Sequence, residues 1–321
     1  MLKRSFCRRG VFLCYNPFME KVIVTGGAGF IGSHIVDALI NKGYNVHIID
    51  NLSSGVEENI NSKATFHNVD IRDFEKLKPI FTNAKYVFHE AAIPQVQYSI
   101  ENPIETHDIN VTGFLNVLES CRLNNVKRLI FASSCAVYGD QKIIPINEDA
   151  NPMPLSPYGA HKYIGESYAS LYFRVFGLET VSLRYFNVYG PRQSSVGAYA
   201  SVIAKFIDLK KQNKPFIIYG DGEQTRSFVN VSDIVNANLQ AMLGDSVGKG
   251  EAINIGTTDK YSVNQIAQMI GVNGDETQKL PARVEIRNIS ADITKAKNLL
   301  NWEPSISLEA GIDELKRYNN I

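Results

Sequence analysis

The sequence has no excess of charge of either sign. Lysine and arginine together number 33, aspartate and glutamate also number 33, and the formal net charge at pH 7 is zero. A nucleic acid or an anionic membrane surface is attracted by a positive field that such a chain does not produce. We therefore expect neither as a partner, and any anionic ligand has to be held by a few local side chains.

Cysteine and long apolar runs are also scarce. The four cysteines, at positions 7, 14, 121 and 135, form no Cys-x-x-Cys pair and no metal-ligand spacing, which predicts no metal site and favours a reducing compartment. The longest apolar runs fall far short of the roughly 20 residues that a membrane-spanning helix needs. With 321 residues and 44% hydrophobic content, we expect a soluble cytoplasmic protein of one large domain or two unequal ones.

Residues 1–18 differ in composition from the rest of the chain. They are basic and aromatic, and they leave no room for the apolar region of a signal peptide. Met19 stands directly before the first predicted strand. We therefore expect residues 1–18 to be an extension outside the fold, with Met19 as the natural start.

A glycine-rich turn follows the first predicted strand. The apolar run Val22–Thr25 stops at Gly26 and Gly27, and helical periodicity continues through Gly29 and Gly32, which predicts a strand, a tight turn and a helix. This spacing is typical of dinucleotide-binding turns, in which one glycine makes the turn, one lets a phosphate approach and one brings helix and strand together. The free N–H groups at the start of the helix would face a pyrophosphate. The alternative is a tight strand-to-helix turn that binds nothing.

A second apolar run, Asn45–Ile49, ends in Asp50. In a dinucleotide-binding fold, an acid at about this distance from the glycines binds the adenosine ribose hydroxyls. A carboxylate there would repel the extra phosphate of NADP, and no arginine follows in residues 51–55, so the sequence favours NAD over NADP. The alternative is that Asp50 is a solvated loop residue.

Strands and helices alternate after this point. Further strands are predicted at 64–69, 86–92 and 128–133, and helices at 104–125 and 157–176. This alternation is typical of a Rossmann-type α/β fold with a doubly wound parallel sheet, which we assign to residues 19–180. Residues 181–321 are less regular, and we expect mainly a smaller α/β substrate-binding lobe with segments that return to the sheet. Helices are predicted there at 198–211, 231–243 and 262–270.

Doubly wound sheets bind ligands at the carboxyl ends of their strands. Asp70 and Ile71 follow one predicted strand, and Ala91 and Ala92 end the next, where small residues would let a flat cofactor lie against the backbone. His89 closes the same apolar strand. A histidine in that position is more often hydrogen-bonded in place than catalytic.

A tyrosine and a lysine lie four residues apart in the next predicted helix. Pro157 suits the start of that helix, so Tyr158 and Lys162 would lie on one helical face. A free phenol has a pKa of about 10, too high for a base near neutral pH, but a nearby ammonium group and a nicotinium ring would favour the phenolate. Ser133 and Ser134 end the preceding strand. The glycine turn and these serines argue against a chance spacing.

Taken together, these motifs resemble those of the NAD-dependent epimerase/dehydratase family of extended short-chain dehydrogenases/reductases, and within it most closely the UDP-sugar 4-epimerases. The resemblance runs from Met19 to near the carboxyl terminus. It is carried by Thr25–Gly32, Asp50–Asn51, Asp70–Ile71, His89–Ala92, Ser133–Ser134, Tyr158 with Lys162, Arg184–Arg192, Gly220–Arg226 and Asn301–Pro304.

This resemblance implies a role for each matching residue. Tyr158 would be the catalytic base, Lys162 would orient the nicotinamide ribose and lower the tyrosine pKa, and Ser134 would hydrogen-bond the reacting sugar oxygen. The residues implied to bind NAD are Gly26, Gly29, Phe30, Ile31, Gly32, Asp50, Asn51, Asp70, Ile71, Ala91, Ala92, Tyr158, Lys162 and Tyr185. Those implied to bind a UDP-sugar are Ser134, Tyr158, Asn187, Arg226 and Glu285.

The reaction implied first is the interconversion of UDP-glucose and UDP-galactose, by transient oxidation at the sugar 4-position with tightly bound NAD. Related dehydratases and decarboxylases place carboxylates where this chain has Cys135 and Ala136, which disfavours those reactions. UDP-N-acetylglucosamine and UDP-glucuronate are alternative substrates, because Ile289 aligns with a position that limits the sugar 2-substituent and is of intermediate size. A non-catalytic NAD-binding regulatory protein and a reductase that consumes free cofactor are alternatives of other classes.

Two further points follow from the resemblance. Segment Ala282–Arg287 departs from the family pattern, with Glu285 where a uridine-ribose-binding acid would align and Arg283 displaced by one residue. The predicted helices at 104–125 and 157–176 resemble the pair through which relatives form two-fold dimers, so a homodimer is expected.

Overall fold

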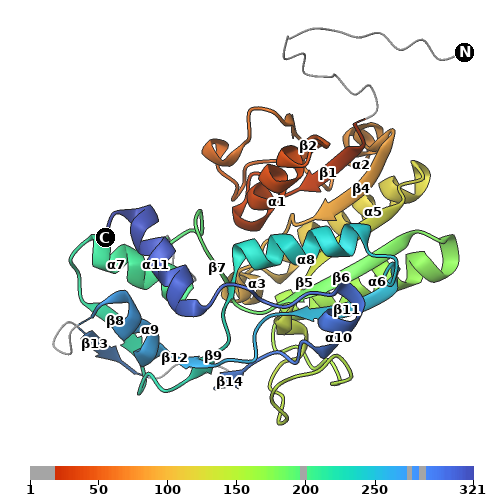
Figure 1. Ribbon diagram of the computed structural model, residues 1–321. Coiled ribbons are helices and arrows are strands. Elements are labelled where there is room, and N and C mark those ends of the chain that lie inside the picture. Colours follow the sequence, from red (N-terminus) through yellow and green to blue (C-terminus); the bar gives the residue numbers. More distant parts are fainter. Residues whose placement is uncertain (1–18, 196–200, 273–276, 282–286) are drawn as a thin grey trace, which may run out of the picture.

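The computed structural model describes residues 19–195, 201–272, 277–281 and 287–321 (Figure 1). Residues 1–18 and Glu285 therefore lie outside the described part of the chain. The main sheet has seven strands in the order β11-β6-β5-β4-β1-β2-β3, and every neighbouring pair is parallel. Its strands are β1 (Lys21–Thr25), β2 (Asn45–Asp50), β3 (Thr65–Asn68), β4 (Ala84–His89), β5 (Arg128–Ser134), β6 (Glu179–Tyr185) and β11 (Lys249–Ile255).

The strand order identifies the ligand-binding edge. The chain runs outward from β1 through β2 to β3, and then returns to β4 on the other side of β1. The loops after β1 and β4 therefore leave the sheet in opposite directions, and ligands of doubly wound sheets bind in the crevice at this switch point. The predicted Rossmann-type α/β fold is confirmed.

Helices cover both faces of the sheet because its strands are apolar on both sides. Val22 and Val24 of β1 belong to one core cluster, whereas Ile23 belongs to the other, as the alternation of side chains along a strand requires. The first face is covered by α1 (Phe30–Asn41), α8 (Val231–Leu243) and α10 (Thr294–Leu300). The second is covered by α2 (Phe74–Leu77), α5 (Gly113–Leu123) and α6 (Pro157–Phe176).

A smaller lobe lies beside the sheet, to the left in Figure 1, and holds the carboxyl terminus. Its core cluster combines Phe206, Phe216 and Ile266 with other apolar side chains from three helices and a short strand pair. The elements are α7 (Val202–Lys211), α9 (Val263–Ile270), α11 (Leu308–Asn319), β8 (Phe216–Tyr219) and β13 (Thr277–Leu280). Between the lobes lie β7 (Val188–Tyr189), β9 (Thr225–Arg226), β10 (Val229–Asn230), β12 (Tyr261–Ser262) and β14 (Asn288–Ile289).

Most predicted elements form, with differences at their ends. The helices predicted at 157–176 and 231–243 are α6 and α8. The predicted helix 104–125 is divided into α4 (Pro103–His107), a π-helical turn at Asp108–Thr112 and α5. The π-helical turn contains Asn110, whose side-chain amide pairs with both backbone groups of Ile93 (2.8 and 3.0 Å). The described part of the helix predicted at 198–211 begins at Val202, because the Ser201 hydroxyl caps it by accepting from Ala204 N.

The last part of the chain is fastened to α8 by one carboxylate. Asp233 is 2% exposed and accepts hydrogen bonds from Ser305 N (3.0 Å), Ser305 Oγ (2.7 Å) and Ile306 N (3.2 Å). Trp302 is also buried, and its Nε1 donates to the backbone oxygen of Asp233 at 2.9 Å. These contacts explain the Asn301–Pro304 motif, because they hold the segment before α11 against the sheet's helical layer.

The substitution Asp233→Ala is expected to lower the free energy of unfolding by about 2–5 kcal/mol, because it leaves two backbone N–H groups and a hydroxyl without their acceptor. Urea unfolding followed by circular dichroism measures the change. Asp245→Ala is the control, since Asp245 lies just beyond α8 and is exposed. Equal stability of the two variants would contradict this anchoring role.

Candidate active site

The glycine turn lies at the switch point between β1 and β4. Gly26 has a left-handed φ of +70°, and a Cβ there would lie 2.6 Å from the backbone nitrogen of Ala91. A Cβ on Gly32 would clash with the backbone oxygen of Gly26. Gly26 requires glycine because of its left-handed backbone and its close contact with the residues after β4. Gly32 requires glycine because α1 approaches the turn closely at this position.

The start of α1 is shaped to accept an anion. Gly29 is the N-cap residue, so no side chain caps the first turn, whose first two residues are Phe30 and Ile31. A Cβ at Gly29 would meet only Gly26 O within 4 Å, at 3.1 Å. N–H groups at a helix start without a side-chain cap fit a dinucleotide pyrophosphate.

Acids and amides gather at the ends of β2 and β3. Asp50 is nearly buried, and its carboxylate accepts from Ala28 N (3.0 Å) and Leu52 N (2.9 Å), so it is a structured residue at the glycine turn and not a solvated one. The Asn51 side chain donates to Asp70 at 2.9 Å. Asp70 also binds Arg72, which lowers the pKa of the Asp70 carboxyl to about 2.

The residues after β4 meet the glycine turn from the other side. Ala91 N lies 3.4 Å from Thr25 Oγ1, and Ala91 and Ala92 are partly exposed. Ile71 points into the second core cluster, so only its backbone can contact a ligand directly. His89 is buried and its Nδ1 shares a 2.8 Å hydrogen bond with Thr25 Oγ1, which gives it the structural role that the sequence favours.

The start of α6 carries the predicted catalytic pair. Ser156 caps the helix by accepting from Gly159 N, Pro157 is its first residue, and Tyr158 N donates to Ser99 Oγ at 3.0 Å. Lys162 Nζ lies 5.8 Å from the centre of the Tyr158 ring and donates to Ala132 O at 2.6 Å. The lysine is thereby fixed between the tyrosine and strand β5.

Ser134 is the last residue of β5 and lies within reach of the same phenol. Its hydroxyl accepts from Ala136 N at 3.1 Å, and a hydrogen bond between Ser134 and Tyr158 favours the phenolate. The structure thus brings Ser134, Tyr158 and Lys162 together at the carboxyl edge of the sheet. No metal-binding group of three or more His, Cys, Asp or Glu side chains occurs within residues 19–195, 201–272, 277–281 and 287–321.

Burial is the largest electrostatic effect on Tyr158 and Lys162. Burial raises the pKa of Tyr158 above its usual value, and the charges of Cys135 and Glu90 raise it further. Burial also lowers the pKa of Lys162, whereas the charges of Glu90 and Glu166 raise it. In the protein without cofactor, burial outweighs the groups that favour the phenolate, so the pKa of Tyr158 lies above that of a free phenol. That Lys162 lowers the tyrosine pKa stays a prediction.

Glu90 and Asn238 also belong to this neighbourhood, and the sequence analysis gives neither of them a role. Tyr185 OH donates to Glu90 Oε1 at 3.0 Å, and Asn238 Nδ2 donates to Tyr185 OH at 2.7 Å. Tyr185 thus links the ends of β4 and β6 with helix α8. An ionisable residue directly after a buried strand is the signal that points to Glu90, whereas nothing in the sequence near Asn238 indicates its partner.

A pocket of about 220 Å³ lies on the side of the smaller lobe. It is lined by Asn187, Val188, Tyr189, Ser201, Val202, Gln224, Arg226, Phe228 and Val263. Asn187 hydrogen-bonds the Cys135 thiol through its backbone, and the charge of Arg226 also acts on that thiol. Two predicted substrate residues, Asn187 and Arg226, thus line the pocket and act on Cys135, the residue after Ser134.

The side chains of these two pocket residues are held by backbone oxygens. Asn187 Nδ2 donates to Ser227 O at 2.8 Å, and Arg226 Nη1 donates to Thr225 O at 2.9 Å. Ile289 is buried in β14, paired in register with Arg226. Ile289 is therefore the strand neighbour of a residue that lines the pocket, and its role in sugar selection stays a prediction.

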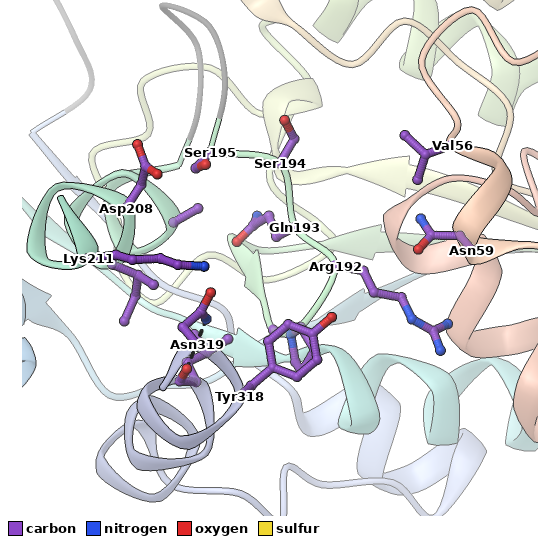
Figure 2. A pocket seen from close by; sticks show the side chains of 15 residues that line it. Val56, Asn59, Arg192, Gln193, Ser194, Ser195, Asp208, Lys211, Tyr318 and Asn319 are labelled. Carbon is purple, nitrogen blue, oxygen red and sulfur yellow. Dashed lines mark hydrogen bonds between the residues drawn. The ribbon is translucent and has the colours of Figure 1, made fainter. Parts of the chain in front are cut away.

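A larger pocket of about 340 Å³ lies elsewhere, between the loop at 190–195, α7 and α11 (Figure 2). Arg192 lines it and forms an ion pair with Asp37 of α1 at 2.7 Å. Tyr318 and Lys211 line it from α11 and α7. None of the predicted site residues lines it, so we assign the chemistry to the smaller pocket. No helix in the described part of the chain is long and apolar enough to cross a membrane.

Comparisons with known proteins agree with this geometry. A protein of Methanocaldococcus jannaschii, provisionally named a UDP-glucose 4-epimerase, is 47% identical over 91% of this chain and 95% of its own length. The crystal structure of a UDP-glucose 4-epimerase from Thermotoga maritima with UDP-glucose has a TM-score of 0.90 at 42% identity, covering 94% of this chain and 98% of that one.

A third similar protein has a different substrate in its name. The structure of a UDP-N-acetylglucosamine 4-epimerase from Methanobrevibacter ruminantium has a TM-score of 0.88 at 38% identity, over 93% of this chain and 97% of that one. The model of the NAD dependent epimerase/dehydratase family matches residues 22–256. The glycine turn and the uncapped start of α1 fit the cofactor for which this family is named. The chain belongs to the NAD-dependent epimerase/dehydratase family.

Proposed function

We propose that this protein is a UDP-sugar 4-epimerase that interconverts UDP-glucose and UDP-galactose. The observation that carries the proposal is the convergence of Ser134, Tyr158 and Lys162 at the carboxyl edge of the sheet. A pocket lined by Asn187 and Arg226 is linked to this group through Cys135, the residue after Ser134. A neutral chain that binds a doubly charged diphosphate needs a local cation. Arg226 supplies it, since its planar fork of donors suits phosphate oxygens.

Each side chain has a distinct task in the proposed reaction. Ser134 holds the sugar 4-oxygen, Tyr158 accepts the proton of the 4-hydroxyl, and Lys162 orients the nicotinamide ribose and stabilises the phenolate. The glycine turn would hold NAD, which would supply reversible hydride transfer at the sugar 4-position. The remaining proposed cofactor contacts are those of Asp50, Asn51 and Asp70 with the adenosine and of Tyr185 near the nicotinamide.

The residues after Ser134 favour epimerisation over elimination. Cys135 and Ala136 stand where dehydration or decarboxylation needs additional acid–base groups. Burial raises the pKa of the Cys135 thiol to about 11, so it is neutral near pH 7 and supplies no carboxylate-like charge. A proton taken by Tyr158 can return to the same oxygen. The product would be the epimer because the 4-keto sugar would turn within the site and receive the hydride on its opposite face.

We also propose a homodimer formed through α5 and α6. Helix α6 exposes apolar side chains on its outer face, among them Leu171, Val175 and Phe176, which are 40%, 60% and 49% exposed. Leu123 of α5 is 41% exposed, and its neighbour Arg122, also on α5, lies over the ring of Phe176 of α6. Adjacent exposed apolar side chains on two neighbouring helices fit a second copy related by a two-fold axis.

Purified protein incubated with UDP-glucose, without added cofactor, is expected to produce UDP-galactose up to equilibrium, because the hydride returns to the sugar. UDP-N-acetylglucosamine and UDP-glucuronate are assayed in parallel by separation of the isomers. A higher kcat/KM for either of these two substrates than for UDP-glucose would reassign the preferred substrate. Absence of epimer from all three substrates, with NAD still bound, would favour a non-catalytic NAD-binding protein, and stoichiometric use of added NADH would favour a reductase.

Tyr158→Phe is expected to lower kcat by about three orders of magnitude or more, because the proton acceptor is lost while the ring remains. Bound NAD, measured after denaturation, and the thermal unfolding midpoint should stay near those of the unchanged protein. Tyr163→Phe, at an exposed position on α6, is the control. Unchanged turnover in Tyr158→Phe would remove Tyr158 from the mechanism.

The double substitution Leu171→Glu with Val175→Glu is expected to give a monomer, because two carboxylates would be buried at the proposed interface. Size-exclusion chromatography with light scattering measures the mass. Tyr318→Glu is the matched control, since Tyr318 is 57% exposed on α11 of the other lobe. A monomeric unchanged protein, or a dimer that survives the double substitution, would argue against this interface.

A further inference from the structure

Glu90 is an ionisable residue of the active site to which the reaction described above gives no task. It directly follows β4, and its backbone nitrogen donates to Thr25 O at 3.1 Å. A Cβ at Gly26 would lie 2.8 Å from the Glu90 carbonyl carbon, so Glu90 stands at the switch point opposite the glycine turn. Its side chain is partly buried there.

Hydrogen bonds show which way the proton of Tyr185 points. Asn238 Nδ2 donates to Ile234 O at 2.9 Å and to Tyr185 OH at 2.7 Å. The amide thus faces Tyr185 with its nitrogen, and the phenol must direct its only proton elsewhere. Glu90 Oε1, at 3.0 Å, is the acceptor that receives it. The chain of donors therefore ends on the carboxylate of Glu90.

The charge of the same carboxylate acts on the proposed catalytic pair, Lys162 and Tyr158, and both groups are desolvated. Charges in a partly buried site interact more strongly than in water. The other groups that interact with this pair come from three elements: Ser134 at the end of β5 with Cys135 after it, Glu166 and His161 on α6, and His89 on β4.

We propose that Glu90 is a positioning residue of the active site, whose carboxylate holds the Tyr185 hydroxyl and balances the charge of Lys162. This proposal rests on the proposed function, in which Tyr158 is the catalytic base. Glu90 helps to keep Lys162 charged, and it opposes a second negative charge on Tyr158. It therefore sets the pH at which the Tyr158–Lys162 pair releases its first proton.

The sign of the expected effect follows from charge alone. Loss of the first proton makes the pair more negative by one unit, whichever of the two residues releases it. A negative Glu90 resists that change, so replacing it with a neutral residue makes the loss easier. Burial raises the pKa of Glu90 itself, so the difference between the two proteins develops as pH rises and Glu90 ionises.

Glu90→Gln is the direct test, because glutamine keeps an oxygen that accepts from Tyr185 but has no charge. We expect the acid limb of the kcat profile to move to lower pH by about one unit in the NAD-loaded enzyme. Glu90→Leu removes the charge and the acceptor, and it should show the same shift together with a lower kcat. Glu148→Gln is the control, since Glu148 is a partly buried carboxylate that accepts from Asn254 N and has no electrostatic effect on Tyr158.

A second readout does not depend on turnover. The ultraviolet absorbance of phenolate is titrated in the Glu90→Gln protein and in the same protein with Tyr158→Phe, and their difference isolates Tyr158 among the 15 tyrosines. The same difference is measured between the unchanged protein and the Tyr158→Phe variant, both of which retain Glu90. The titration in the Glu90→Gln background should lie at lower pH than this reference. Unmoved curves in both readouts would overturn the proposal for Glu90. Full turnover in Tyr158→Phe would instead overturn the proposed function.

Discussion

A buried ion pair between Arg184 of β6 and Glu166 of α6 fixes the position of the helix that carries the proposed catalytic pair. Two hydrogen bonds join them, Nη2 to Oε2 at 2.6 Å and Nε to Oε1 at 2.8 Å, and both side chains are nearly inaccessible. A buried ion pair contributes little net stability. Loss of one partner leaves an uncompensated buried charge, which lowers the free energy of unfolding by about 3–5 kcal/mol. Glu166 lies one helical turn beyond Lys162 and two beyond Tyr158. The pair therefore orients the face of α6 that carries both.

The same network extends from the sheet to the end of the chain. Arg184 Nη1 donates to Tyr138 OH, which donates in turn to Asn254 Oδ1 of β11, at 2.7 and 2.6 Å. Asn254 Nδ2 then donates to the backbone oxygens of Ile146 and Asp292. A fully satisfied polar network inside an apolar core has few alternative arrangements. Strands β6 and β11 are thereby held against α6.

The features predicted from sequence are local ones. The glycine turn, the start of α6 at Pro157 and the pairing of Tyr158 with Lys162 each depend on residues within one or two helical turns, so spacing reveals them. The contact of Glu90 with Tyr185 spans 95 positions, and that of Tyr185 with Asn238 spans 53. No periodicity encodes such separations. For the same reason the sequence gives the direction of neither the Tyr158 nor the Lys162 pKa shift, since burial is a property of the assembled site.

Burial of Tyr158 has a consequence for when the proposed base can act. In the protein alone its pKa lies above that of a free phenol, and Lys162, which would stabilise the phenolate, is itself desolvated. The carboxylates of Glu90 and Glu166 help to keep Lys162 protonated, and the hydrogen bond with Ser134 favours ionised Tyr158. These contributions do not offset burial, so ionisation of Tyr158 near neutral pH requires additional positive charge in the cleft. A positively charged nicotinium ring at the glycine-rich crevice would provide it, which would couple proton abstraction to the presence of oxidised cofactor.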